Sequence, residues 1–320
     1  MSYYLVDGMY GFIIGDALGV PVEFTRRAER KEDPVTSMSG YGTHNQPAGT
    51  WSDDSSMALA TLDSIKEKGC IDLEDIMARF SDWAYCGHYT PFGEVFDVGI
   101  ATNKALLRFA QGERADKCGG TGERDNGNGS LMRILPVCIY LCERQKEVCT
   151  SEDECIYHIH AVSALTHAHI RSQMACGIFY FCVKHIIDGK GSLFNRLQKG
   201  MDEAFSYYRR DLSNLAELDN FSRLASLSTF RNTPEDEIKS SGYVVDTLEA
   251  AIWCLINTNY YDEAVLKSVN LGDDTDTVGA VTGALAGLYY KLEGIPKDWA
   301  AALQNEALLK EIIYKGYDGD

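Results

Sequence analysis

The sequence predicts an all-α fold in a single domain that covers residues 1–320. Apolar residues recur at helical spacing along most of the chain, and alternating stretches flanked by hairpin turns are essentially absent. The seven prolines fall mostly between the helical segments. A hydrophobic fraction of 45% is enough for one large core or for two modest domains. No low-complexity linker and no fixed-period repeat divides the chain, so we expect one domain.

Twelve segments carry the helical pattern. They are residues 3–18, 54–67, 73–85, 93–109, 131–141, 152–165, 170–187, 193–208, 243–256, 260–268, 277–292 and 296–312. Ser151-Glu152-Asp153-Glu154 has the form of a capping box, and Thr233-Pro234-Glu235 offers a cap followed by proline. Three long connections remain at residues 25–51, 111–129 and 213–242, and connections of this length are usually functional or disordered.

Two of these expected helices carry a stripe of glycines. The stripes are Gly8, Gly11, Gly15 and Gly19 in the first helix, and Gly279, Gly283 and Gly287 in segment 277–292. Each glycine costs about 1 kcal/mol of helix propensity relative to alanine, and close backbone approach between two helices would compensate. A stripe of this kind also occurs in lipid, but Asp16 lies within the first one. We therefore expect both helices at the buried centre.

The charge of the chain limits its partners. Thirty basic side chains against 47 acidic ones give a net charge of −17, which repels phosphate and so disfavours nucleic acid and anionic membranes. A phosphate-bearing ligand must then be held by helix N-termini, backbone amides or metal ions. No apolar run reaches the ~18 residues of a membrane span, and no signal peptide is recognised. Ten cysteines without a CxxC pair are typical of buried thiols in a cytoplasmic protein, and the lack of a heptad seam favours a monomer.

Two acidic clusters each open an expected helix. They are Ser52-Asp53-Asp54 and Asp273-Asp274-Thr275-Asp276-Thr277. Helix capping alone explains either cluster. Together, however, they contain five aspartates, which repel one another unless a cation lies among them. Oxygen ligands without clustered histidine or cysteine favour Mg²⁺, Mn²⁺ or Ca²⁺, and two converging clusters would form a two-metal site.

A third candidate site is the glycine-rich segment Asp125-Asn126-Gly127-Asn128-Gly129-Ser130-Leu131-Met132-Arg133. Its glycines allow the backbone to approach a ligand, and the free N–H groups of the helix that follows could hold a diphosphate. An ordinary capped turn explains the segment equally well, and it lacks the GxxxxGK[ST] pattern of nucleoside triphosphate hydrolases. His167 and His169 do not share a helix face, so binding of one metal ion by both is disfavoured. Each could be a buried core histidine or could contact a ligand hydroxyl.

Taken together and in this order, these segments resemble the ADP-ribosylglycohydrolase family, which includes the glycohydrolases that reactivate dinitrogenase reductase. The matching stretches are residues 15–23, 49–54, 96–99, 127–133, 166–167, 242–250 and 273–277. The resemblance implies an orthogonal all-α bundle with two Mg²⁺ or Mn²⁺ ions in a cleft. The metal ligands that it implies are Ser52, Asp53, Asp54, Asp274, Asp276 and Thr277. The family more often has threonine where Ser52 stands, and the hydroxyl ligand is kept.

The same resemblance implies a substrate site. It places Glu23 beside the metals and the scissile bond, and Asp97 opposite the acceptor guanidinium. His167 would contact a ribose or a phosphate, and Tyr243 would lie on the adenosine side. The implied diphosphate loop consists of Gly127, Asn128, Gly129, Ser130, Leu131 and Met132.

The implied reaction is metal-dependent hydrolysis of the bond between C1 of the distal ribose and its acceptor, with Asp53, Asp274 or Glu23 as general base. We expect ADP-ribosyl-arginine on protein as the substrate and ADP-ribose as a product. The alternatives are serine-type or other O-linked ADP-ribose, nucleic-acid-linked ADP-ribose, and a catalytically silent ADP-ribose-binding protein. Asp97 and residues 242–250 favour the arginine type, the net charge disfavours nucleic acid, and the complete ligand set favours an enzyme.

Overall fold

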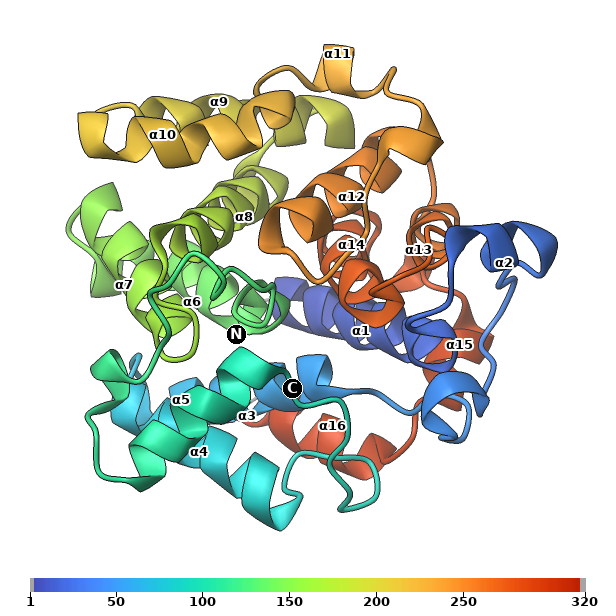
Figure 1. The fold of residues 1–320 in the computed structure, drawn as a ribbon, viewed down its shortest axis with the longest axis horizontal. Helices are drawn as coiled ribbons and strands as arrows, with labels where there is room; N and C mark the ends of the chain where they lie inside the picture. Colours follow the sequence, from blue (N-terminus) through green and yellow to red (C-terminus); the bar gives the residue numbers. More distant parts are fainter. Residues whose placement is uncertain (1–2, 317–320) are drawn as a thin grey trace.

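The computed structural model describes residues 3–316, without the side chains of residues 145 and 146, and its helices surround a central pair, α1 and α14 (Figure 1). The helices are α1 (Tyr3–Gly19), α2 (Arg27–Glu32), α3 (Asp53–Lys68), α4 (Leu73–Cys86), α5 (Ile100–Ala110), α6 (Leu135–Val148), α7 (Glu152–Ala164), α8 (Ile170–Asp188), α9 (Leu193–Tyr208), α10 (Leu215–Leu218), α11 (Leu227–Phe230), α12 (Val244–Ile256), α13 (Tyr261–Val269), α14 (Thr275–Tyr290), α15 (Lys297–Ala302) and α16 (Glu306–Tyr314). Short 3₁₀ turns connect several of them. Residues 3–316 contain no β-strand, which confirms the all-α prediction.

Each expected helical segment contains a helix, but some boundaries were wrong. Residues 93–99 lie outside α5, because Gly93 and Asp97 have positive φ angles of 78° and 56° that a helix does not tolerate. Segment 131–141 is a 3₁₀ turn (Leu131–Arg133) followed by α6. Segment 296–312 divides into α15 and α16, because Asn305 adopts a left-handed conformation and its side chain accepts the N–H of Leu308 to start α16.

Two of the three expected long connections contain helices of their own. Residues 25–51 include α2, and residues 213–242 include α10 and α11. The start signal at residues 233–235 leads only to a 3₁₀ turn without a side-chain cap. At the start of α7, Ser151 accepts the N–H of Glu154 as predicted, whereas the Glu154 carboxylate accepts the N–H of Thr150 and not that of Ser151.

The two glycine stripes face each other, as predicted. A Cβ atom on Gly15 would lie 2.1 Å from the carbonyl oxygen of Gly279, and one on Gly19 would lie 2.3 Å from Cα of Asp276. The backbones of α1 and α14 therefore touch directly. Because Asp276 is in the first turn of α14, this contact also fixes one acidic cluster against the end of α1.

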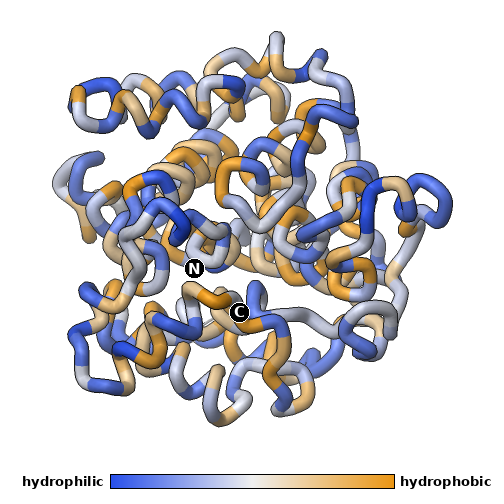
Figure 2. Tube along the Cα trace, in the orientation of Figure 1, coloured by the Kyte–Doolittle hydropathy of each residue, from blue (hydrophilic) through white to orange (hydrophobic). Residues whose placement is uncertain are grey.

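The apolar character of α1 corrects one expectation. The stretch Tyr3–Val22 does reach the length and composition of a membrane-crossing helix. Every residue of its most apolar window is buried inside the fold, so α1 supplies the core of this structure. Hydrophobic residues gather along the central helices and hydrophilic ones at the outer turns (Figure 2). All ten cysteines are free thiols, and Cys70 and Cys86 alone are exposed.

Candidate active site

The two acidic helix starts meet in one place. The hydroxyl of Thr277, on α14, donates to Oδ1 of Asp54, on α3, over 3.3 Å, although the two residues are 223 positions apart in the chain. Side-chain oxygens of Glu23, Asp274 and Asp276 lie within 4.8 Å of one another. The convergence that a joint site requires is therefore present.

Buried backbone contacts hold these helix starts in position. Ser52 caps α3, because its Oγ accepts the N–H of Asp54 over 3.3 Å. Asp16 of α1 is buried and accepts the N–H groups of Ser52 and Ser55 over 3.0 and 3.1 Å, so α3 begins directly on α1.

A second pair of contacts places Glu23 beside the start of α14. The N–H of Phe24 donates to the carbonyl oxygen of Asp273 over 2.7 Å, and the N–H of Asp273 donates to the carbonyl oxygen of Thr25 over 2.8 Å. Phe24 and Asp273 both have positive φ angles, 61° and 62°. Such a conformation costs on the order of 1 kcal/mol in a residue other than glycine, so the fold stores strain where the acidic groups meet.

A cavity of about 330 Å³ opens at this junction. Its walls are formed by Glu23, Phe24, Asp53, Asp54, Asp97, Gly99, Ile100, Ala101, Thr102, Arg124, Gly127, Asn128, Gly129, Met132, His167, Gly242, Asp274 and Thr277. The cavity thus brings together most of the site residues expected from the sequence, from six separate parts of the chain.

Three carboxylates at this junction each have one oxygen without a hydrogen-bond partner among the described residues. These buried oxygens are Oδ2 of Asp54, Oδ1 of Asp274 and Oδ2 of Asp276. Burial, and after it the charges of Asp97 and Asp274, raises the pKa of Glu23 to about 10. Burial and neighbouring carboxylates likewise raise the pKa values of Asp54 and Asp276 well above the usual range.

These properties fit a divalent cation. A buried oxygen without a partner costs about 1–3 kcal/mol, and crowded negative charges add to that cost. The donors are carboxylates and a hydroxyl, which are the ligands of hard cations. The residues present therefore fit a Mg²⁺-like ion.

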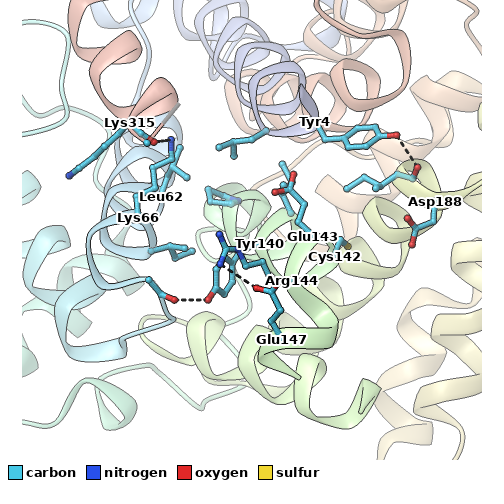
Figure 3. Close-up of a pocket in the computed structure, with 17 residues that line it drawn as sticks. Tyr4, Leu62, Lys66, Tyr140, Cys142, Glu143, Arg144, Glu147, Asp188 and Lys315 are labelled. Atoms are coloured by element: carbon cyan, nitrogen blue, oxygen red, sulfur yellow. Dashed lines mark hydrogen bonds and ion pairs between the residues drawn. The ribbon is translucent and has the colours of Figure 1, made fainter. Parts of the chain in front are cut away.

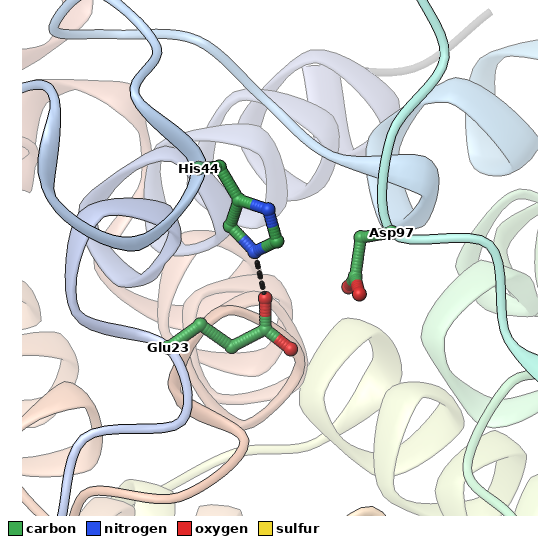
Figure 4. A group of neighbouring side chains, drawn as sticks. All are labelled: Glu23, His44 and Asp97. Atoms are coloured by element: carbon green, nitrogen blue, oxygen red, sulfur yellow. Dashed lines mark hydrogen bonds and ion pairs between the residues drawn. The ribbon is translucent and has the colours of Figure 1, made fainter.

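His44, which contacts the cavity residue Glu23, is a neighbour of the site that the sequence did not predict. Its Nε2 is hydrogen-bonded to Oε2 of Glu23, and the carboxylate of Asp97 points toward this pair (Figure 4). The ring centroid of His44 lies 6.1 Å from that of Phe24 and 5.0 Å from that of Phe96. Its only signal in the sequence was its position in the long connection 25–51, which has no periodic pattern.

The glycine-rich segment forms the opposite wall. Asn128 donates its backbone N–H to the carbonyl oxygen of Gly242 over 3.0 Å, and its side-chain Nδ2 to Oδ2 of Asp274 over 2.9 Å. A Cβ atom on Gly129 would lie 2.7 Å from Cε1 of His167, so only glycine allows this approach. His169 is not part of this wall: it caps α8 by accepting the N–H of Arg171 over 3.2 Å.

Five of the expected site residues do not line the cavity. Asp276 is buried behind it, close to Glu23 and Asp274. The Ser130 hydroxyl accepts a hydrogen bond from Ser163 over 2.9 Å, and Leu131 belongs to the hydrophobic core. The Tyr243 ring centroid lies 5.9 Å from the guanidinium of Arg171. Ser52, as described above, caps α3. Lining residues that the sequence reasoning did not single out include Phe24, Ile100, Thr102 and Arg124.

A larger cavity, of about 730 Å³, lies elsewhere, between the start of α1, the end of α3 and α6 (Figure 3). Polar side chains at this cavity donate hydrogen bonds to backbone carbonyl groups of the protein. Nζ of Lys66 donates to the carbonyl oxygens of Ile312 and Ile313 over 2.8 and 2.7 Å. The hydroxyl of Tyr140 donates to the carbonyl oxygen of Gly69 over 2.8 Å. The smaller cavity, where Asp54 and Asp274 each have a buried oxygen without a partner, is therefore the better candidate for chemistry.

The chain is similar to several known proteins along most of its length. A family model described as ADP-ribosylglycohydrolase matches residues 5–318. The ADP-ribosylarginine hydrolase Tri1 of Serratia proteamaculans is 31% identical over 316 residues, which cover 98% of this chain and 79% of that protein. The ADP-ribosyl-dinitrogen reductase glycohydrolase of Rhodospirillum rubrum is 27% identical, over 92% of this chain and 87% of its own. A solved structure described as an ADP-ribosylglycohydrolase-related protein complex matches with a TM-score of 0.75 and 28% identity, over 97% of this chain and 95% of that one.

Proposed function

The chain belongs to the ADP-ribosylglycohydrolase family, and from this premise we propose that it hydrolyses the bond between ADP-ribose and arginine side chains of modified proteins. We also propose that it does so with two bound Mg²⁺ or Mn²⁺ ions. The observation that carries this proposal is the set of three buried, unpartnered carboxylate oxygens, on Asp54, Asp274 and Asp276, that two distant helix starts bring together.

The proposed metal ligands come from these two helix starts. They are Ser52, Asp53 and Asp54 at the start of α3, and Asp274, Asp276 and Thr277 at the start of α14. Bound there, the ions would supply Lewis acidity and lower the pKa of a water molecule. Hard oxygen donors suit Mg²⁺ and Mn²⁺ equally, so the donor set leaves both metals in the proposal.

The other cavity residues divide into two chemical ends. At the acidic end, Asp53, Asp274 or Glu23 would accept the proton of the attacking water, and Asp97 would pair with the guanidinium of the acceptor. Nearby carboxylates would also stabilise the positive charge that develops on the ribose ring. At the other end, residues 127–132 and His167 would hold the diphosphate through N–H donors.

Arginine is the proposed acceptor for two reasons. Asp97 lies on the cavity wall, where a cationic leaving group would meet a negative charge. The Serratia relative carries the name ADP-ribosylarginine hydrolase. We further propose a single-domain cytoplasmic monomer, in line with the ten free thiols and the one hydrophobic cluster that extends from Leu5 to Ile313.

The test is release of free ADP-ribose from matched arginine-, serine- and nucleic-acid-linked substrates. We expect release from the arginine substrate, its loss in EDTA, and its recovery with Mg²⁺ or Mn²⁺. Asp53→Ala and Asp276→Ala should abolish release without loss of the helical circular dichroism spectrum, whereas Asp273→Asn, at an exposed neighbouring position, should retain it.

Each other outcome contradicts a stated part of the proposal. Full activity in EDTA would exclude the metal-dependent mechanism. Release only from the serine- or nucleic-acid-linked substrate would replace the proposed acceptor. Binding of ADP-ribose without any turnover would make the protein a silent ADP-ribose-binding member of the family.

A further inference from the structure

Arg133 has an unusual environment beneath the cavity. Its side chain is 0% exposed, and no carboxylate among the described residues pairs with it. Nη2 donates to Oγ1 of Thr166 over 2.8 Å and to the carbonyl oxygen of Val162 over 3.2 Å. Nε and Nη1 have no hydrogen-bond partner in residues 3–316, and the guanidinium lies 4.7 Å from the ring centroid of Phe80. A buried arginine without a carboxylate is costly, so its position calls for an explanation.

The explanation begins with the hydroxyl of Thr166. Arginine only donates hydrogen bonds, so Oγ1 of Thr166 must accept from Nη2 of Arg133. The same Oγ1 lies 2.8 Å from Nδ1 of His167. Either the Thr166 hydroxyl donates to an unprotonated Nδ1, or a protonated Nδ1 donates to Oγ1.

Hydrogen-bond satisfaction separates these two arrangements. In the second, Oγ1 accepts twice, and the hydroxyl hydrogen of Thr166 has no acceptor within residues 3–316. Thr166 is 0% exposed, so water does not replace the missing partner. In the first arrangement, the hydroxyl and Nδ1 are both satisfied. The first arrangement is therefore the stable one.

The remaining proton position follows from the chemistry of the ring. Burial, and after it the charge of Arg133, lowers the pKa of His167 to about 3, so the ring is neutral at physiological pH. A neutral imidazole without a proton on Nδ1 carries it on Nε2. Nε2 faces the glycine-rich wall, since Cβ atoms on Gly127 and Gly129 would lie 3.4 and 3.3 Å from it.

We propose that Arg133 and Thr166 are positioning residues that hold the proton of His167 on Nε2, so that the cavity presents an N–H donor to an oxygen acceptor of ADP-ribose. The identity of the ligand in this inference rests on the proposed function. The position of the proton rests only on the hydrogen bonds around His167. It also orients the ligand: the donor at His167 takes an oxygen, and the carboxylates of Glu23 and Asp97 face the cationic end.

The first test reads the proton position directly. Two-bond ¹H–¹⁵N correlation spectra of protein with ¹⁵N-labelled histidine, recorded near neutral pH without metal or ligand, distinguish a ring protonated on Nε2, on Nδ1 or on both. The chain has seven histidines, and the signal missing from His167→Gln assigns His167. We expect Nε2–H alone. A proton on Nδ1, or on both nitrogens, would overturn the proposal, and the proton position itself is read from the native chain.

The second test removes the hydroxyl that links Arg133 to His167. In Thr166→Val, Nδ1 loses its donor, so we expect the Nε2–H signal to give way to a mixture or to Nδ1–H, and Thr166→Ser should restore it. ADP-ribose binding, measured by calorimetry, should weaken by about tenfold in Thr166→Val and recover in Thr166→Ser, as for loss of one hydrogen bond. An unchanged tautomer in folded Thr166→Val would contradict the proposed roles.

A matched control and the wild type separate this inference from the proposed function. Thr61 is a buried threonine of α3 whose hydroxyl donates to the carbonyl oxygen of Met57 over 2.8 Å. Thr61→Val should leave both the tautomer and the affinity unchanged. If the wild type has Nε2–H but neither binds ADP-ribose nor releases it, the proposed function fails. If it releases ADP-ribose but His167 carries its proton on Nδ1, only the present inference fails.

Discussion

Asp276 is a buried side chain that destabilises the fold that contains it. It is 0% exposed, its Oδ1 accepts the N–H of Thr277 over 2.8 Å, and its Oδ2 has no partner among the described residues. Burial raises its pKa, and the charges of Glu23 and Asp54 raise it further. Without a cation this carboxylate destabilises the protein, and a cation bound as proposed would give it a ligand bond.

We therefore predict opposite effects of Asp276→Asn on stability and on metal response. In EDTA, the variant should be more stable than the wild type by about 1–3 kcal/mol, because a buried charge is removed and the new amide can donate to neighbouring carboxylates. The increase in melting temperature on addition of Mg²⁺ or Mn²⁺ should be lost. Thermal unfolding with and without metal measures both effects.

Asp273→Asn is the control for this prediction. Asp273 is exposed at the same helix start, and asparagine tolerates its positive φ of 62°. This variant should keep the wild-type metal response. An Asp276→Asn protein that melts below the wild type in EDTA, or that still responds to metal, would refute the prediction.

At the residue scale, the sequence could predict the acidic groups but not all of their neighbours. Asp53, Asp54, Asp274 and Asp276 are recognisable because more carboxylates gather at two helix starts than capping requires. His44 reaches the cavity only through a contact with Glu23 that no local pattern encodes. Long-range side-chain contacts of this kind depend on the finished fold.

The contact between α1 and α14 makes a second prediction, at the scale of the element. A Cβ atom on Gly15 would meet the backbone oxygen of Gly279 at 2.1 Å, and neither helix can yield locally. A Cβ atom on Gly8, in the same helix, would meet Cδ2 of Leu288 at 3.0 Å, and this side chain can rotate. We expect Gly15→Ala to lower the free energy of unfolding by at least about 2 kcal/mol despite the better helix propensity of alanine.

Gly8→Ala is the matched control, and its effect should stay within about 1 kcal/mol. Gly15→Ala should also weaken the stabilisation by metal, because displacement of α14 moves Asp276 away from α3. Urea unfolding with and without Mg²⁺ measures both quantities. Equal stability of the two variants would show that the helices do not approach each other this closely.

A half-buried histidine of α7, packed against α9, predicts a pH dependence. The ring of His160 stacks on Tyr208 at a centroid distance of 5.9 Å, and its Nε2 is hydrogen-bonded to the Tyr208 hydroxyl over 2.8 Å. Burial lowers the pKa of His160 to about 4, from 6.5. Between these two pH values the unfolded chain binds more protons than the folded chain, so stability falls as the pH falls.

His160→Gln should remove this contribution. The difference in free energy of unfolding, wild type minus variant, should be larger at pH 7 than at pH 4.5 by about 2 kcal/mol, the value that a shift from 6.5 to 4 implies. Urea unfolding at the two pH values measures it. His88→Gln, at an exposed position, should show no comparable change, and a pH-independent difference for His160→Gln would contradict the assignment.

Helix boundaries show where local reasoning ends at this scale. The sequence could predict α8 and α9 almost to the residue, because apolar spacing and end signals coincide there. Residues 93–109 and 296–312 were each expected as one helix, and both are interrupted by residues with positive φ, Asp97 and Asn305. Positive φ at Asp97 and Asn305 is not predicted by their residue types alone, although Gly93 and Gly99 flank the first break.

For the whole molecule, the fold class could be predicted because helical periodicity is a local property repeated along the chain. The pairing of α1 with α14 was also accessible, because glycine stripes favour close packing. The site itself depends on residues 54 and 277, which lie 223 positions apart, and only the resemblance of the ordered motifs brought them together in advance. The net charge of −17 belongs to this scale as well, since every part of the chain contributes to it.

That charge predicts how the enzyme should choose among protein substrates. A negative field accelerates the approach of positively charged partners and slows that of negative ones, and salt screens it over a Debye length of about 10 Å at 0.1 M. Two peptides that carry ADP-ribosyl-arginine between lysines or between glutamates should therefore differ roughly tenfold in kcat/KM at low salt, in favour of the lysine peptide. The difference should shrink at 0.5 M salt, roughly to the value set by contacts alone. Small-molecule ADP-ribosyl-arginine, which has no flanking charges, is the control for salt effects on the chemical step. A lysine preference that is independent of salt would instead assign selection to direct contacts near Asp97 and Glu23.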